Sequence, residues 1–163
     1  MSSERAGGRG SVRPAGEAPR DESDNAFTPI LRAVRASVPS VLAAAFVDLD
    51  GECIDYVSSI DAYDAKVTAA HLLVLMTALR KARAKLGLNE AVALEIAGAQ
   101  RELWGRRVSE EHLLAVVLAP GFDRVQLRAA LARAASEFRE EVELDTPAWE
   151  PSANPSRDWR VRG

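Results

Sequence analysis

The sequence predicts an α+β fold with three helices and five strands, in the order helix, two strands, long helix, three strands, helix. Three observations lead to this prediction. Apolar residues recur at helical spacing in three segments, and five short apolar or alternating runs are separated by turn residues. In addition, no internal repeat or linker interrupts the series, so we expect one domain.

Composition limits the classes of protein to which the chain can belong. Of its 163 residues, 47% are hydrophobic and 28% are charged, which is typical of a soluble globular protein. The net charge of −3 is too small to indicate attraction to nucleic acid or to a membrane surface. No apolar run approaches the roughly 20 residues that cross a bilayer, and the N-terminus does not resemble a signal peptide. We therefore expect a cytoplasmic protein with no nucleic-acid partner and no membrane insertion.

The two ends of the chain differ from its centre. Residues 1–25 carry Gly, Ser, Pro, Arg and acidic residues with almost no large apolar side chain, so we predict a disordered tail. Residues 26–143 form the predicted domain. Residues 144–163 contain three prolines and are predicted to be largely disordered. Two tryptophans in this tail, Trp149 and Trp159, leave two alternatives open: one packs back onto the domain, or Trp159 belongs to a docking motif.

The first predicted elements are a short helix and a hairpin. Thr28 as N-cap and Pro29 at the first position begin a helix that Pro39 ends. Its apolar face consists of Ile30, Leu31, Val34 and Val38. Residues 41–58 follow as two strands joined by a tight turn at Asp50-Gly51. The first strand is apolar throughout, which predicts a central strand, and the second alternates, which places it nearer an edge.

Three more strands and a helix complete the series. The strands lie in residues 90–98, 101–109 and 111–119, with turns at Gly98 and at residues 109–111. The nearly continuous apolar run 112–118 predicts a second central strand. The final helix is predicted to start at Asp123, where Gln126 completes a pattern similar to a capping box. Its predicted apolar face consists of Val125, Leu127, Leu131, Ala134, Ala135 and Phe138.

The long central helix, residues 61–86 with Gly87 as C-cap, is apolar on more than one side. One stripe, predicted to dock on the sheet, contains Leu72, Leu75, Met76, Leu79, Ala82 and Leu86. The other sides still carry Val67, Ala70, Leu73, Val74 and Ala78. A surface helix of a monomer normally carries charge there, so we predict burial on two faces, with a partner chain as the second cover. The alternative is that the first or last helix covers that side within the monomer.

The stretch "FVDLDGECIDYV" (46–57) and the strand trio with its helix, residues 92–131, resemble the Roadblock / dynein light chain family across residues 27–142. The resemblance implies an α/β sandwich: a five-stranded antiparallel sheet with the long helix on one face and the terminal helices on the other. It also implies dimerisation through the long helix and an adjoining strand edge, giving a sheet continuous across two subunits. Family members serve as platforms for small Ras-like GTPases, and bacterial members are often paired with one.

The resemblance implies a bacterial, non-enzymatic adaptor: a homodimer that binds a small Ras-like GTPase and modulates its nucleotide state or localisation. The alternative is a structural scaffold subunit that does not sense nucleotide. The candidate partner-binding residues lie on the long helix, and the sequence does not separate their use in self-association from their use in partner binding. They are Ala70, Leu73, Val74, Thr77, Arg80 and Lys81.

No catalytic residue, metal site or cofactor is predicted. "DLDGE" (48–52) lacks the later ligands of a calcium loop, so we interpret it as a hairpin turn. His71 and His112 do not have metal-ligand spacing, and Cys53 has no recognisable partner base. Three arginines flank Trp104, namely Arg101, Arg106 and Arg107. An arginine finger for a GTPase is one hypothesis for them. Ordinary exposed strand arginines are the favoured interpretation.

Overall fold

A computed structural model describes residues 16–142 of the chain. The helices are α1 (Thr28–Ser37), α2 (Ala62–Ala82) and α3 (Arg124–Glu141). The strands are β1 (Val41–Asp48), β2 (Cys53–Ser58), β3 (Ala93–Ala97), β4 (Glu102–Arg107) and β5 (His112–Leu118). The predicted order of elements is therefore confirmed. Residues 1–15 and 143–163, with the predictions made for Trp149 and Trp159, lie outside the described residues.

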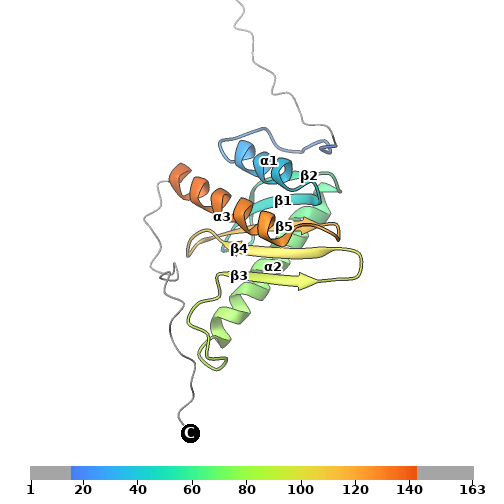
Figure 1. Cartoon of the computed structure of the whole chain (residues 1–163). Coiled ribbons are helices and arrows are strands. Elements are labelled where there is room, and N and C mark those ends of the chain that lie inside the picture. The colour runs from blue at the N-terminus through green and yellow to red at the C-terminus, as the bar shows by residue number, and fades with distance from the viewer. Residues whose placement is uncertain (1–15, 143–163) are drawn as a thin grey trace, which may run out of the picture.

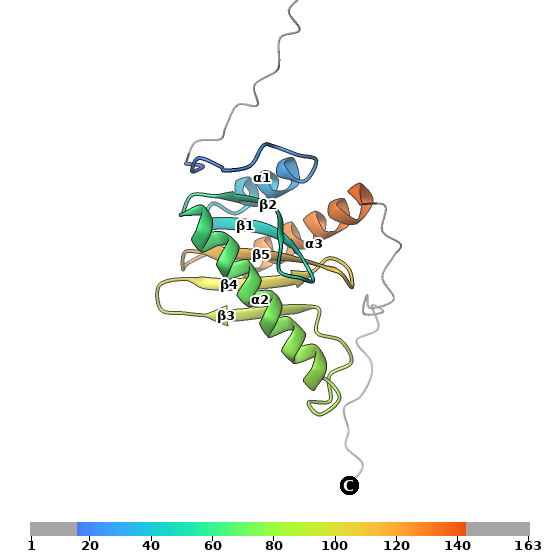
Figure 2. The same cartoon turned by 180° about the vertical axis from the view of Figure 1, so that it is seen from behind.

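All five strands pair antiparallel in the order β2-β1-β5-β4-β3. Figures 1 and 2 show the long helix α2 alone on one face of this sheet and the helices α1 and α3 next to each other on the opposite face. This is the α/β sandwich that the family resemblance implied. The positions of β1 and β5 at the centre and of β2 at an edge are also confirmed. Both central strands are buried along most of their length because helices cover them on both faces.

The sheet separates two cores of different character. Between the sheet and α1/α3 lie large side chains, among which Phe46 and Phe138 stack with ring centroids 4.2 Å apart. The core beneath α2 is smaller, and alanines from both sides contribute to it: Ala45, Ala69 and Ala115. Small side chains allow a helix to approach a sheet closely. The alanines therefore let α2 lie close to the sheet.

The orientation of α2 differs in part from the predicted one. The buried residues of the helix are Ala65, Ala69, Leu72, Leu73 and Met76. Leu75, which was predicted to dock on the sheet, is 45% exposed, whereas Leu73 is only 7% exposed. The helix also ends at Ala82, so Leu86 lies in the following turn, where Gly87 adopts a φ of 68°. The predicted stripe was wrong at these positions because an almost uniformly apolar helix has no periodicity that selects one face.

Residues 16–25, which we call the N-terminal strap, lie against β2 and α1. The N–H of Ala18 donates to the carbonyl oxygen of Ser58 at the outer edge of β2 (2.7 Å). Arg20, with its side chain 3% exposed, forms an ion pair with the fully buried Asp55. The structure thus places in the domain ten residues that the sequence assigned to a disordered tail. Composition alone could not show this, because the segment is held by ion pairs with distant residues, among them Arg20 with Asp55 and the buried Glu17 with Arg32.

Asp55 also explains a difference at the start of α1. The structure places Thr28 as the first helical residue, with Phe27 as the N-cap, so Thr28 is not the cap that the sequence predicted. Its hydroxyl donates to Asp55 (2.6 Å), and the N–H of Tyr56 donates to the same carboxylate (2.8 Å). Three donors from three segments therefore converge on one buried carboxylate, which pairs its charge and satisfies its oxygens.

Candidate protein-binding surface

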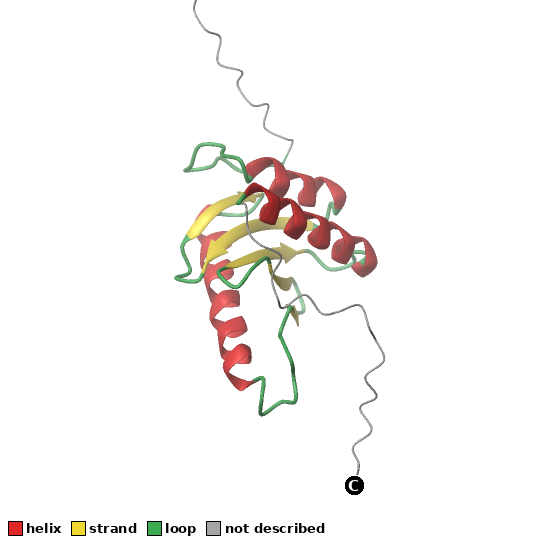
Figure 3. Ribbon diagram, turned by 90° about the vertical axis from the view of Figure 1, so that its left-hand side faces the viewer, coloured by secondary structure: helices red, strands yellow, loops and turns green. Residues whose placement is uncertain are grey.

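The outward face of α2 exposes large apolar side chains. Val74 is 64% exposed and Leu75 is 45% exposed, and Tyr63 near the start of the helix is exposed as well. Figure 3 shows that α1 and α3 lie on the far side of the sheet, so neither helix covers these residues. The alternative of a cover by the terminal helices within the monomer was therefore wrong. Adjacent exposed apolar side chains of this size are typical of interaction sites.

The exposed part of α2 lies next to an open edge of the sheet. β3 is the last strand at that end, and no further strand pairs with it among residues 16–142. Figure 2 shows that the C-terminal half of α2 crosses β3 and continues past the edge. Leu94 and Ile96 on β3 are only partly buried against the core beneath α2. We call this region the α2–β3 surface; it comprises Val74, Leu75, Leu79, Leu94 and Ile96.

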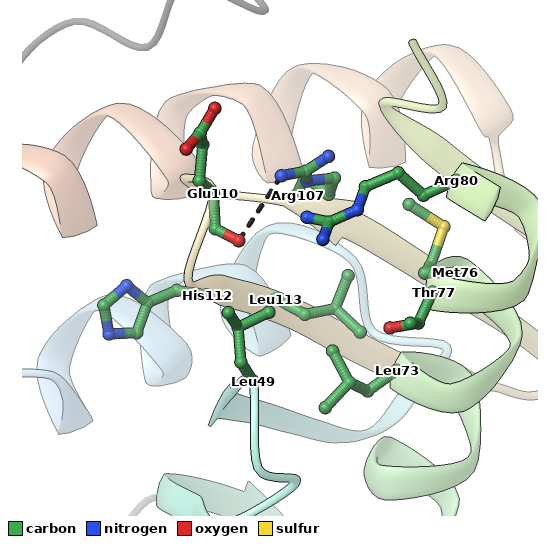
Figure 4. Close-up of a pocket in the computed structure, with 9 residues that line it drawn as sticks. All are labelled: Leu49, Leu73, Met76, Thr77, Arg80, Arg107, Glu110, His112 and Leu113. Atoms are coloured by element: carbon green, nitrogen blue, oxygen red, sulfur yellow. Dashed lines mark hydrogen bonds between the residues drawn. The ribbon is translucent and has the colours of Figure 1, made fainter. Parts of the chain in front are cut away.

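The opposite flank of α2 borders a small hollow, which we call the α2 hollow. Its volume is about 20 Å³, enough for one water-sized group. The lining residues come from α2, from the β1–β2 turn and from the β4–β5 region: Leu49, Leu73, Met76, Thr77, Arg80, Arg107, Glu110, His112 and Leu113. Figure 4 shows the guanidinium group of Arg80 reaching across the hollow toward Arg107, while the His112 ring and the Glu110 carboxylate point away.

Arg107 is held in place beside this hollow. Its guanidinium donates to the carbonyl oxygens of Ser109 and Glu110, each at 3.4 Å, and forms an ion pair with Glu90 (3.2 Å). Glu90 also pairs with Arg83, just beyond the end of α2. Burial is the main reason that the pKa of Arg107 lies below its usual value, and the positive charge of Arg80 lowers it further. An arginine nevertheless keeps its charge at neutral pH.

The six predicted partner-binding residues fall into two groups. Leu73, Thr77 and Arg80 meet at the α2 hollow. Val74 and Lys81 are exposed on the outward side of the helix, and Ala70 is half-buried. Sequence reasoning did not identify Leu49 or Arg107 as part of this site, and it placed Leu75 against the sheet. The sequence did contain an indication for Leu49. A leucine in an otherwise polar hairpin turn suggests that its side chain contacts a neighbouring element.

The three arginines considered as arginine fingers do not lie together in one site. Arg101 is exposed in the β3–β4 connection, whereas Arg106 and Arg107 are neighbours on one strand and so project to opposite faces of the sheet. Arg107 is buried, so the interpretation of all three as exposed strand arginines is wrong for this residue. Trp104 between them is 2% exposed and packs edge-on against Phe122, with ring centroids 5.9 Å apart.

The turn at residues 48–52 is a hairpin turn, as predicted. The Asp48 side chain accepts hydrogen bonds from the N–H groups of Asp50 and Glu52, both at 3.0 Å, and Gly51 adopts a φ of 83°. This carboxylate therefore serves the turn itself. Among residues 16–142, no group of three or more His, Cys, Asp or Glu side chains is arranged to hold a metal ion. Within the same range, no helix has the length and apolarity needed to span a membrane.

The two histidines lie in different surroundings. His71 is exposed on α2. His112 stacks on Phe46, with ring centroids 5.1 Å apart, and its Nδ1 is 2.9 Å from the Ser109 hydroxyl. Burial lowers the pKa of His112, although the nearby carboxylates of Glu111 and Asp48 oppose this shift. A neutral, packed imidazole at physiological pH follows, which fits a structural side chain.

Cys53 is expected to be a slow nucleophile in the folded protein. Burial raises the pKa of its thiol to about 12, and the nearby charge of Glu22 adds to the shift. Because only the thiolate reacts, its modification by a disulfide reagent at pH 8 should be at least about 100-fold slower than in urea-unfolded protein. Each rate is measured from the absorbance of the thiol that the disulfide reagent releases when it reacts with Cys53. Comparable rates in the two states would contradict this description of Cys53.

Comparisons with known proteins identify the fold. A scan against protein-family models gave no match, and neither did a search of curated proteins. Among solved structures, a Roadblock/LC7 domain from Streptomyces avermitilis matches with a TM-score of 0.64 and 19% identity, covering 70% of this chain and 95% of that one. MglB from Myxococcus xanthus matches with a TM-score of 0.64 and 19% identity, covering 73% of this chain and 98% of that one.

A third similar structure is described as MglB with a tetrameric arrangement. It has a TM-score of 0.65 and 15% identity, covering 72% of this chain and 88% of that one. At this level of identity, the three matches establish architecture. The described domain has the fold of Roadblock/LC7 domains, which confirms, for the fold, the resemblance seen in the sequence.

Proposed function

We propose that this Roadblock-fold chain is a non-enzymatic cytoplasmic adaptor that forms a homodimer and binds a small Ras-like GTPase, modulating its nucleotide state or localisation. The observation that carries the proposal is the exposed apolar side of α2 next to the open edge of β3. The structural similarity to MglB supports a regulatory or adaptor role of this kind.

The α2–β3 surface suits self-association. An unpaired strand edge offers backbone donors and acceptors to a second chain, and the apolar residues beside it offer area to bury. If two copies meet through the same surface, β3 pairs with β3 and the two α2 helices lie close together. The tetrameric arrangement named for one MglB structure supports self-association in proteins of this fold.

The remaining outward side of α2 suits a second protein. Arg80 and Lys81 are exposed there, in the last turn of the helix. Basic side chains beside an apolar surface favour an acidic partner and accelerate encounter. An adaptor can change the nucleotide state of a GTPase only by binding its GTP and GDP states with different affinities.

Capture of purified small Ras-like GTPases, each loaded with GDP or with a non-hydrolysable GTP analogue, tests the proposal. We expect the immobilised protein to bind one nucleotide state at least about tenfold more tightly. Lys81→Glu should weaken capture, whereas Lys85→Glu, the same change beyond the end of α2, should have a smaller effect. Equal capture of both states would favour the scaffold alternative, and no capture by any of the GTPases would contradict the proposal.

A further inference from the structure

An open groove runs along the outward side of α1, between this helix and the start of the N-terminal strap. Its volume is about 580 Å³, within the range of roughly 300–1,000 Å³ that is typical of ligand sites. We call it the α1 groove. Four of its lining residues are exposed apolar residues of α1 and the turn after it, and we call them the α1 stripe: Pro29, Ala33, Ala36 and Pro39. The small side chains of the stripe leave room for a large side chain to lie on the helix.

Two arginines, one helical turn apart, line one flank of the stripe and differ in how well they are paired. Arg32 binds both oxygens of the buried Glu17 carboxylate, at 3.0 and 2.8 Å, and also pairs with Asp24. Arg35 has weaker contacts. Its Nε donates to the carbonyl oxygen of Val41 (3.3 Å), and its Nη1 lies 4.0 Å from Glu17, beyond hydrogen-bond distance.

The terminal nitrogens of Arg35 therefore have donors to offer. Within the part of the chain that the structure describes, they donate no hydrogen bond, although the side chain is only 16% exposed. Burial also lowers the pKa of Arg35 below its usual value, while the charge of Glu17 opposes this shift. A second carboxylate in the groove would stabilise the guanidinium through charge-assisted hydrogen bonds.

Charge distinguishes the segments of the chain that could enter the groove. Residues 1–15 contain three arginines and one glutamate, so Arg35 would repel them. Residues 152–163, which include Trp159, are also basic, with three arginines and one aspartate. Residues 143–151, "ELDTPAWEP", contain three carboxylates, no basic residue and one large apolar side chain, Trp149. Only this acidic segment matches both the guanidinium and the apolar stripe.

The acidic segment starts close enough to reach the groove. Phe138 near the end of α3 packs against Phe27, just before α1, with ring centroids 5.7 Å apart. Figure 3 shows the two helices side by side. The seven residues from Val142, the last described residue, to Trp149 can span up to roughly 23 Å. Because the 10 residues of α1 make a helix only about 15 Å long, Trp149 can reach the stripe.

We propose that residues 143–151 dock in the α1 groove of their own chain. The indole of Trp149 packs on the α1 stripe, and the carboxylate of Glu150 pairs with Arg35. Pro151 restricts Glu150 to extended or polyproline backbone conformations, and in a polyproline helix consecutive side chains point about 120° apart. The indole can therefore face the stripe while the carboxylate faces the arginine flank.

Tethering favours this docking even where the contacts themselves are weak. A segment joined to its site by a short linker meets it at an effective concentration of about millimolar. Pro147 and Pro151 also reduce the conformational entropy that the segment loses on docking. The groove lies on the face of the sheet opposite to α2, so a docked segment leaves the α2–β3 surface free. Docking therefore does not depend on the proposed function, and it assigns Trp149 to packing against the domain.

Fluorine NMR of the full-length protein labelled with 5-fluorotryptophan tests the docking. The three tryptophans give three signals, which the variants Trp149→Phe and Trp159→Phe assign. A neutral gadolinium chelate in the solvent broadens the signals of accessible indoles. We expect the Trp149 signal to be broadened several-fold less than the Trp159 signal. Equal broadening of the two signals would overturn the proposal.

Two pairs of variants locate the docking site on the domain. Arg35→Gln removes the charged donors and should lower the docking equilibrium constant at least about fivefold. Arg128→Gln removes an equal charge from α3, where the arginine is 62% exposed, and should leave it unchanged. Ala36→Gln places a longer side chain in the groove and should displace the indole, whereas Ala129→Gln, at an exposed position of α3, should not. Glutamine is a good helix former, so neither helix is disrupted. Equal effects within either pair would overturn the proposal.

A variant of the segment itself tests the ion pair without changing the described domain. Glu150→Gln should increase the broadening of the Trp149 signal as much as Arg35→Gln does. Asp158→Asn, the matched loss of a carboxylate in the basic part of the C-terminal segment, should not. A Trp149 signal that stays protected in both Glu150→Gln and Arg35→Gln would overturn the proposed pairing.

Other occupants of the groove would give different results. We expect nuclear Overhauser contacts between the Ala36 methyl group and the Trp149 indole, and contacts with Val12 instead would place the N-terminal residues in the groove. Protection of Trp149 should persist when Val74 and Leu75 are both replaced by glutamate, because a segment of the same chain needs no second copy. Its loss in that variant would show that another copy supplies the segment. Either of these results would overturn the proposal.

Discussion

Replacing Val74 and Leu75 together with glutamate is expected to leave the protein folded but monomeric. Both side chains are largely exposed in the single chain, at 64% and 45%, so the substitutions remove little from its core. In a symmetric dimer the same change places four carboxylates in one apolar interface, and the cost of burying unpaired charge there is several kcal/mol. We expect the dimer dissociation constant to rise at least about 100-fold.

Light scattering coupled to size exclusion measures this change. The wild type should have twice the chain mass of 17.6 kDa, and the double variant should have the chain mass itself. Val125→Glu is the matched control, since Val125 is 77% exposed on α3, on the opposite face of the sheet. A glutamate at Leu73 would not be informative, because that residue is buried in the monomer and its loss would unfold the chain. A double variant with the wild-type mass and melting temperature would exclude the α2–β3 surface as the interface.

Asp55→Ala is expected to destabilise the domain by about 3–5 kcal/mol, a typical cost of removing one partner of a buried ion pair. The substitution removes the closer of the two carboxylates that pair with the buried guanidinium of Arg20 and leaves only that of Asp24, at 3.8 Å. It also removes the acceptor of the Thr28 hydroxyl and of the Tyr56 N–H. Urea denaturation monitored by circular dichroism measures the free energy of unfolding.

Two comparisons identify the cause of that loss. Arg128→Ala removes an ion pair with Glu95 at a site where the arginine is 62% exposed, and it should cost no more than about 1 kcal/mol. Trypsin reports separately on the N-terminal strap, since the buried Arg20 should be cleaved slowly in the wild type and quickly in Asp55→Ala under native conditions. An Asp55→Ala protein as stable as Arg128→Ala, with Arg20 still protected, would show that the ion pair does not hold the strap.

Local chemistry predicted the elements of this fold well. The Asp50-Gly51 turn, the capping residue Asp123 and the apolar run of β5 each depend on neighbours along the chain, and each appears in the structure as predicted. The orientation of α2 could not be predicted in the same way. Leu73 and Leu75 have the same side chain on the same helix, and packing against distant strand residues of the core beneath α2 is what distinguishes them.

The candidate site could be predicted from the sequence even less completely than the orientation of α2. The sequence suggested Val74, Arg80 and Lys81 because they lie on an apolar helix with a basic end, and the structure places all three at the surface. The hollow itself joins Leu49, Thr77 and Arg107, which come from three separate segments. No pattern of spacing connects such residues, because their proximity depends on the antiparallel order of the strands. The strap is a similar case, since Arg20 and Asp55 are 35 residues apart.

The two edges of the sheet differ in how the described residues cover them. At β2 the strap occupies outward-facing backbone acceptors, with Ala18 donating to Ser58 and the Asn25 side chain donating to Ile54. Among the described residues, no further strand pairs with the outer edge of β3. A subunit with one free sheet edge can pair edge to edge with only one other copy. Such pairing stops at two subunits and cannot extend into a fibre.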